Sequence, residues 1–183
     1  MRNMLLRAVD AALFKRGVYS DVGNDYQAIL HALGVVMIAG IAFGISLTGL
    51  EQTGSGGVDN ERLANRLIGL WVTITTLLIG WIIWVMLCYL LGSKLMRGGA
   101  GYRQLLRAIG ICYGPAILIL LMGVPRVGDI APFVGLVWIL IAGVAATHEL
   151  QELDWLSSSL ATLPGWILSF WVLPVAFFGS FIS

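Results

Sequence analysis

Five apolar stretches, each long enough to cross a lipid bilayer, dominate this chain and leave only short polar pieces between them. We expect them at residues 28–50, 67–91, 105–124, 130–147 and 160–182. A membrane helix needs about 20 apolar residues to cover a hydrocarbon core of about 30 Å, and lipid offers backbone N–H and C=O groups no hydrogen-bond partner. The sequence therefore predicts an all-α membrane protein with five transmembrane helices in one domain, residues 1–183.

Composition supports this class and limits the partners. The chain is 58% hydrophobic and 11% charged, whereas about 25% of the residues of an average soluble domain are charged. The net charge of +1 provides no overall field that would attract nucleic acid. We therefore expect membrane lipids, anionic lipids among them, and other membrane proteins or a second copy of the chain as partners, and no nucleic acid.

The distribution of basic residues predicts the orientation. Eight of the eleven basic residues lie before the first stretch or between the second and third, namely Arg2, Arg7, Lys15, Arg16, Lys94, Arg97, Arg103 and Arg107. Because cytoplasmic loops carry the excess of Lys and Arg, we place the N-terminus in the cytoplasm and the C-terminus outside. The piece after the fourth stretch is acidic, so one alternative stays open, in which the third and fourth stretches form a re-entrant pair.

The residues before the first stretch predict a helix at the membrane surface. Over residues 3–17, a helical period places one apolar face, with Arg7, Asp10 and Lys15 on the other side; the apolar face comprises Leu5, Ala8, Val9, Ala12 and Leu13. Such a helix lies flat among the lipid headgroups, although a solvated cytoplasmic tail is an alternative. Glycine and polar residues from Gly17 to Asp25 then predict a stop and a turn.

The connection between the second and third stretches is the clearest candidate site. Residues 92–107 hold four cations, Lys94, Arg97, Arg103 and Arg107, and no acidic residue. Cations close to an anionic leaflet each contribute about 1 kcal/mol of attraction, so this segment is a candidate contact for lipid or for a partner. The alternative is an orientation signal with no further role. Its glycines do not form a phosphate loop, because the Gly-Lys-Ser/Thr ending is missing.

Small residues and prolines predict how the helices pack. Gly40 and Gly44 form one GxxxG pair, and Gly110 and Gly114 form another, which allows close approach of two helix backbones. Pro115 follows directly in the third stretch, and Pro174 lies in the fifth. Proline removes a backbone donor, so we expect a kink or local unwinding at both positions.

No catalytic, cofactor or metal motif is visible in the sequence. It has no nucleophile paired with a base, no carboxylate pair and no metal-ligand spacing. His31 stands alone near the start of the first stretch, which is more typical of an interfacial hydrogen-bond partner than of a ligand. Cys88 and Cys112 lie within apolar stretches and are interpreted as buried small side chains. We therefore predict a protein that is not an enzyme and holds no cofactor.

The order of these features resembles the Yip family of membrane proteins. The resemblance rests on a short charged N-terminal helix, five closely spaced stretches, the basic glycine-rich connection, the segment Gly110 to Pro115 that opens the third stretch, and the segment Thr147 to Leu153 that ends the fourth. It implies a single Yip-like domain. Eukaryotic members of the family are known to interact with Rab GTPases and have a long cytoplasmic N-terminal region. The short N-terminal segment here resembles a bacterial-type member instead.

The resemblance implies a non-enzymatic role in the bacterial cytoplasmic (inner) membrane. The first hypothesis is an adaptor or organising protein that acts through helix–helix and lipid contacts. A second is an accessory subunit of a larger respiratory or photosynthetic complex. A third is a small oligomeric permease or channel, against which the scarcity of polar groups at membrane depth argues.

Overall fold

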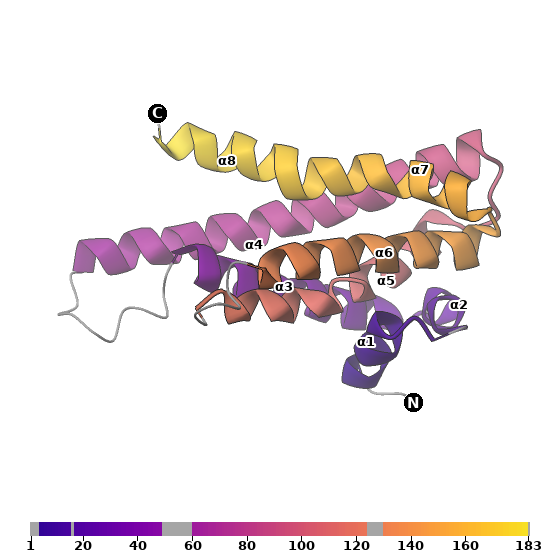
Figure 1. Cartoon of the computed structure of the whole chain (residues 1–183), viewed down its shortest axis with the longest axis horizontal. Helices are drawn as coiled ribbons and strands as arrows, with labels where there is room; N and C mark the ends of the chain where they lie inside the picture. The colour runs from indigo at the N-terminus through magenta and orange to yellow at the C-terminus, as the bar shows by residue number, and fades with distance from the viewer. Residues whose placement is uncertain (1–3, 16, 49–59, 124–129, 183) are drawn as a thin grey trace.

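A computed structural model describes residues 4–15, 17–48, 60–123 and 130–182, and Figure 1 shows the whole chain. In these ranges every regular element is helical. Five segments are long and apolar enough to cross a membrane, at Ala28–Thr48, Leu63–Leu95, Tyr102–Leu120, Ala131–Gln151 and Trp155–Phe177. The predicted all-α fold with five membrane-spanning helices is therefore confirmed.

In the described ranges, the five long segments are built from nine helical pieces that differ in their winding. They are α3 (Ala28–Thr48), α4 (Asn60–Cys88) with the π-helical η2 (Tyr89–Leu95), α5 (Tyr102–Ile111) with the 3-10 helix η3 (Gly114–Gly123), α6 (Ala131–Gln151), and α7 (Trp155–Ile167) with the π-helical η4 (Leu168–Val172) and α8 (Leu173–Ile182). Two short helices, α1 (Met4–Ala12) and α2 (Val18–Asn24), precede them.

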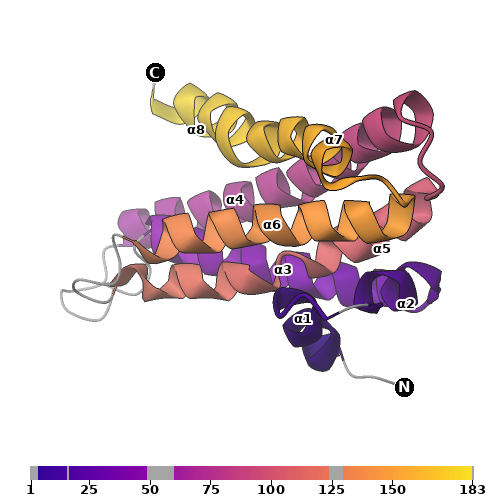
Figure 2. The same cartoon turned by 45° about the vertical axis from the view of Figure 1, so that its right-hand side comes forward.

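The long helices run side by side and form layers. In Figures 1 and 2, α7 and α8 cover one side of α4, and α3 lies on its other side with α5 and α6. The short helices α1 and α2 gather at one end of this bundle, beside the start of α3 and α5. That end also holds η2 and the link between α6 and α7, so most of the charged residues described below lie there.

A buried tryptophan occupies the centre of the bundle. Trp84 is fully buried and its Nε1 donates a hydrogen bond to the Thr162 carbonyl oxygen at 3.0 Å. Its ring packs edge-on against Tyr113, with 5.8 Å between ring centroids. Two glycines make room for it, since a Cβ on Gly143 or Gly165 would come within 2.6 Å or 2.4 Å of the indole. Small residues thus allow α6 and α7 to close on α4.

Both prolines expected to interrupt helices lie at changes of winding. The regular helix α5 ends at Ile111, and the chain continues from Gly114 as a 3-10 helix that contains Pro115. Pro174 follows directly after the π-helical segment η4. In both places the chain accommodates the missing backbone donor by changing its hydrogen-bond spacing, as the sequence predicted.

The N-terminal helix forms as expected, but its polar side faces inward. In α1, Arg7 and Asp10 are buried against the protein, while Leu6 and Val9 are exposed, as is Leu13 just after the helix. Of the predicted polar side only Lys15 is exposed; Arg7 turns inward because the carboxylates of Asp21 and Asp25 lie there, and Asp10 pairs with Lys15. The outward apolar side is the one that a surface helix buries in lipid.

The turn expected between Gly17 and Asp25 is instead the short helix α2. Gly17 is the N-cap residue of α2 and has a φ of 79°, a conformation that glycine adopts without strain. The following residues wind into a helix because a carboxylate from α6 caps its first turn. The predicted stop before Gly17 and a turn before α3 are present, but the sequence analysis missed α2, because local turn signals cannot show such a cap.

Candidate functional site

The basic connection between η2 and α5 is held in a fixed shape. Within it, the Ser93 hydroxyl donates to the Ala100 carbonyl at 2.7 Å, and the Gly98 N–H donates to the Gly92 carbonyl at 2.9 Å. The Gly99 N–H donates to the backbone carbonyl of Gln151 at 3.3 Å. These bonds close the connection on itself and join it to the end of α6.

Gln151 is the side chain on which the connection rests. It is buried, and its Nε2 donates to the Cys88 carbonyl at 3.0 Å. A Cβ on Gly92 would lie 1.6 Å from Gln151 Oε1, and one on Gly98 would lie 2.7 Å from Gln151 Cβ. Glycines at these two positions therefore let the connection pack directly on the Gln151 side chain.

Three of the four predicted cations are on the surface of this connection. Lys94, Arg97 and Arg103 are exposed, and Lys94 Nζ lies 5.6 Å from the Tyr89 ring centroid. Arg97 has a φ of 62°, which marks the tight reversal before the glycines. The three side chains thus form an exposed basic surface, which we call the basic platform (Lys94, Arg97 and Arg103).

Arg107 differs from the other three because it is buried. It is 6% exposed, and its Nη1 donates to the Gly23 carbonyl at 2.8 Å. Its guanidinium carbon lies 4.9 Å from the centroid of the Tyr26 ring, a cation–π arrangement. Arg107 therefore joins α5 to the end of α2, a placement that a count of basic residues could not predict.

A second buried arginine anchors the N-terminal helix. Arg7 Nη1 lies 2.6 Å from Asp25 Oδ2 and 3.4 Å from His31 Nδ1, and Nη2 lies 3.9 Å from Asp21 Oδ2. The hydrogen bond from Arg7 lowers the pKa of Asp25 below its usual range, and the backbone N–H of Gln27 adds to this effect. His31, predicted to be an interfacial hydrogen-bond partner, lies beside this cluster.

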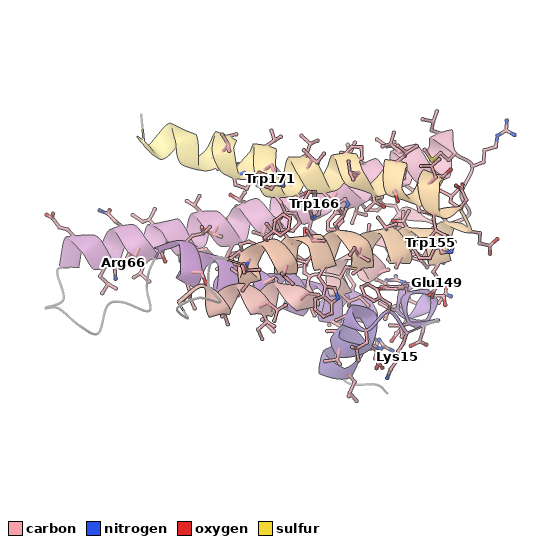
Figure 3. All side chains as sticks on the ribbon, viewed as in Figure 1. Lys15, Arg66, Glu149, Trp155, Trp166 and Trp171 are labelled. Carbon is pink, nitrogen blue, oxygen red and sulfur yellow. The ribbon has the colours of Figure 1, made fainter. Side chains whose placement is uncertain are left out.

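Glu149, at the end of α6, caps α2. Its two carboxylate oxygens accept from the backbone N–H groups of Gly17 at 3.1 Å and Ser20 at 2.8 Å. A carboxylate at a helix N-terminus is stabilised by the free N–H groups and by the helix dipole. Figure 3 shows Glu149 with Lys15 and Trp155 at the same end of the molecule, and Arg66 at the opposite end.

Two further residues organise this end of the bundle. The Asp154 carboxylate accepts from the N–H groups of Leu156 and Ser157 at the start of α7, and the hydrogen bonding from Ser157 lowers the pKa of Asp154. The His148 ring stacks on Trp155 with 4.2 Å between centroids. The acidic piece after the fourth stretch therefore serves mainly as helix caps.

The predicted packing glycines lie at contacts between helices. A Cβ on Gly40 would meet Ile74 Cα at 3.2 Å, and one on Gly44 would meet Leu70 Cδ1 at 2.4 Å, both on α4. A Cβ on Gly110 would meet Ala32 Cβ at 2.6 Å, whereas Gly114 faces Ala8 at ordinary distance and Pro115 is buried beside it. In this arrangement both GxxxG pairs face neighbours within the chain.

The sequence analysis missed a seam of hydroxyl groups between α4, α6 and α7. Thr147 and Thr162 are buried and their hydroxyl oxygens lie 3.0 Å apart, while Ser169 donates to the Gly80 carbonyl at 2.6 Å. Each of the three hydroxyls also lies within hydrogen-bond distance of the carbonyl four residues earlier in the chain, which offers its proton a second acceptor. The seam therefore contributes to the contact between these helices. The only sequence signal for it is the presence of hydroxyl residues within the fourth and fifth apolar stretches.

Nothing in the described ranges gathers three or more His, Cys, Asp or Glu side chains as a metal site would require. Cys88 and Cys112 are both buried and unpaired with one another, as interpreted from the sequence. The chemistry that this end of the molecule offers is charge and hydrogen bonding.

Comparison with known proteins gives one finding. The sequence model of the Yip1 domain family matches residues 16–180. That range begins just before α2 and ends within α8, so it covers all five membrane-spanning segments. No curated protein and no solved structure matches the chain.

Proposed function

Because this chain belongs to the Yip1 domain family, a family of membrane proteins, we propose that it is a non-enzymatic adaptor or organising protein acting through helix–helix and lipid contacts. Its five apolar spans make it a multi-pass membrane protein. The proposal extends to a bacterial-type family member in the cytoplasmic membrane, with the N-terminus in the cytoplasm as the basic residues predict.

The fixed shape of the basic connection carries this proposal. An orientation signal needs only positive charge close to the membrane, whereas recognition gains affinity when the binding groups are ordered beforehand. Here Gly92 and Gly98 pack on a buried Gln151 and hold Lys94 and Arg97 in a defined turn. This ordering supports a docking role for the basic platform.

The outer surface of the spans supports the second part of the proposal. Large apolar side chains are exposed along all the long helices, among them Leu30, Ile41, Trp71, Ile82, Phe133, Ile141, Leu160, Trp171 and Val175. In a bilayer such a surface meets lipid tails or the helices of other proteins. Figure 3 shows Trp166 and Trp171 along the layer formed by α7, η4 and α8.

The test is neutralisation of the basic platform in the full chain. We expect the triple variant Lys94→Gln, Arg97→Gln and Arg103→Gln to lose most of the proteins and anionic lipids that accompany the wild-type protein through mild detergent extraction, as counted by quantitative mass spectrometry. The matched control neutralises Arg62, just before the second span, and Arg66, near its start, both at the opposite end of that span from the platform. We expect this control to retain the accompanying proteins and lipids.

Orientation must be measured in the same samples, because the platform also contributes to topology. If a triple variant of unchanged orientation retains the wild-type set of proteins and lipids, the platform is an orientation signal and the adaptor proposal is wrong.

A further inference from the structure

The guanidinium of Arg107 is buried without a carboxylate partner among the described residues. Its Nη1 is satisfied by the Gly23 carbonyl, but its Nε has no acceptor in this part of the chain. Arg7 is also buried and its Nε also has no acceptor in the described chain, but it differs in charge, since Asp25 Oδ2 lies 2.6 Å from its Nη1. A buried charge is costly unless an opposite charge and hydrogen bonds compensate it. Arg107 therefore lacks an anion.

Arg107 lines a cavity that is open to the surface. The cavity has a volume of about 430 Å³, and its lining includes Gly23, Asn24, Tyr26, Gly101, Arg103 and Arg107; we call it the Arg107 pocket. The cation of Arg103 is exposed at its rim. The pocket thus places one buried and one exposed guanidinium around the same space, with no acidic side chain in its lining.

The first turn of α5 contributes backbone donors to the same pocket. The helix starts at Tyr102 after the N-cap residue Gly101, and the Gln104 N–H donates to the Gly101 carbonyl at 3.0 Å. The N–H groups of Tyr102 and Arg103, before it, have no acceptor within the helix. The Gln104 side chain is engaged elsewhere, since its Oε1 accepts from the Gly101 N–H and its Nε2 donates to Asn24 Oδ1. Free backbone donors and the positive end of the helix dipole favour an anion here.

The pocket lies where two membrane spans begin. Its lining residues immediately precede or open the spans Ala28–Thr48 and Tyr102–Leu120. Tyr26 is 79% exposed beside it, and Leu30, one turn into α3, is 70% exposed. A polar, cationic pocket that borders an exposed apolar surface at the ends of spans matches the level of phospholipid headgroups.

From these contacts we infer that the Arg107 pocket binds a phosphate group, and that its source is the headgroup of an anionic phospholipid. Arginine suits this role because its planar guanidinium donates paired hydrogen bonds to phosphate oxygens. The phosphate would accept from the Arg103 and Arg107 side chains and from the start of α5. This inference deepens the proposed function, on which it rests for the location of the protein in a membrane.

The test uses purified full chain in a neutral detergent, titrated with dioleoylphosphatidylglycerol and, separately, with dioleoylphosphatidylcholine. Native mass spectrometry reports the number of bound lipids. We expect phosphatidylglycerol to bind the wild type in preference to phosphatidylcholine, and Arg103→Gln and Arg107→Gln each to weaken this binding about tenfold, the loss expected for one charge-assisted hydrogen bond. Lys94→Gln, on the basic platform but outside the pocket, should weaken this binding much less than either arginine variant.

A parallel titration with sodium phosphate distinguishes the two sources of the group. If phosphate raises the unfolding temperature of the wild type but not of Arg103→Gln, and phosphatidylglycerol shows no preference, the pocket binds phosphate but the lipid assignment is overturned. If both ligands bind the wild type, Arg103→Gln and Arg107→Gln equally, there is no phosphate site. Since Arg103 is exposed, its variant decides the matter should Arg107→Gln fail to fold.

These outcomes are separate from those of the adaptor test. The lipid titration contains no other protein, and its control removes Lys94, a member of the basic platform. If Arg103→Gln loses phosphatidylglycerol binding and Lys94→Gln largely keeps it, the result supports the pocket. This conclusion holds whether or not the platform captures proteins.

Discussion

Arg7 on α1 donates to the Asp25 carboxylate across 2.6 Å, and this pair attaches the N-terminal helix to the chain just before the first membrane span. Arg7 is buried, while Asp25 lies nearer the surface with 31% of its side chain exposed. The same carboxylate also accepts from the Gln27 N–H through its other oxygen at 2.9 Å. The pair thus determines where α1 sits relative to the start of α3.

The Arg7–Asp25 pair should make the attachment of α1 sensitive to acid. The Arg7 hydrogen bond lowers the pKa of the Asp25 carboxyl below its usual value of 3.8. The stabilisation of the folded state by this pair is therefore complete well above pH 3.8 and is lost as pH falls through the lowered folded-state pKa. We expect the unfolding temperature in detergent, and resistance of α1 to proteolysis, to decrease as pH is lowered from about 5 through this range.

Asp25→Asn is the matched control for this acid sensitivity. The variant should be less stable than the wild type at neutral pH and should show a smaller further loss in acid, because its amide does not titrate. Asp154, whose pKa is also lowered, is present in both proteins and contributes to the remaining acid dependence. Equal acid dependence in the two proteins would contradict the role of the pair.

Gly92→Ala should destabilise the protein by about 1–3 kcal/mol, the range for overpacking a well-packed site. The new Cβ would overlap Gln151 Oε1, and moving that amide breaks its hydrogen bond to the Cys88 carbonyl. Chemical or thermal unfolding in detergent measures the loss. Gly99→Ala is the control, because a Cβ there meets nothing within 4 Å.

The partner of Gly92 can be identified with a double-mutant cycle. In a Gln151→Ala background the overlapping amide is absent, so we expect Gly92→Ala to cost much less than it does in the wild type. If the two changes add independently, the cost of the alanine arises from another contact.

The fold could be predicted because each span carries its own signal. Twenty apolar residues in succession specify a membrane helix regardless of what surrounds it, and Pro115 and Pro174 mark local changes of winding through a missing donor that is fixed by the residue itself. The ends of the spans were predicted less accurately, since the second span extends to Leu95 whereas the predicted stretch ends at residue 91. Its added turns are π-helical and contain polar residues, which hydropathy does not assign to a span.

The site was only partly predictable because its contacts are long-range. The sequence shows that Arg103 and Arg107 are basic, but not that one is exposed and the other buried beneath Tyr26. Likewise Glu149 caps a helix 129 residues earlier at Ser20, which no local pattern reveals. Burial and capping by distant residues depend on packing, and a single sequence does not specify which faces meet.

Gly110→Ala should weaken the contact between α5 and α3. The added Cβ would lie 2.6 Å from Ala32 Cβ and 3.2 Å from its Cα, and backbone cannot move aside as a flexible side chain can. We expect a loss of about 1–3 kcal/mol in the free energy of unfolding. Gly135→Ala, also in a buried helix position but with its nearest contact at 3.5 Å, should cost less and serves as the control.

The orientation predicted from the basic residues can be measured with single added cysteines. Cys88 and Cys112 are fully buried, so both should react slowly with a membrane-impermeant maleimide in native membranes, and a new surface cysteine would dominate labelling. Lys94→Cys should be labelled only after the cytoplasmic side is opened, since its connection is predicted to be cytoplasmic. Thr53→Cys, between the first two spans, should be labelled in intact cells.

The reverse labelling pattern would place the basic platform outside and overturn the orientation. Labelling of Thr53→Cys and Ser183→Cys from the same side is also required, because five complete spans put the first connection and the C-terminus together on the face opposite the N-terminus. The re-entrant alternative differs only at the connection between the third and fourth segments, which Arg126→Cys tests. Labelling of Arg126→Cys in intact cells shows that both segments cross, whereas no labelling in intact cells supports the re-entrant pair.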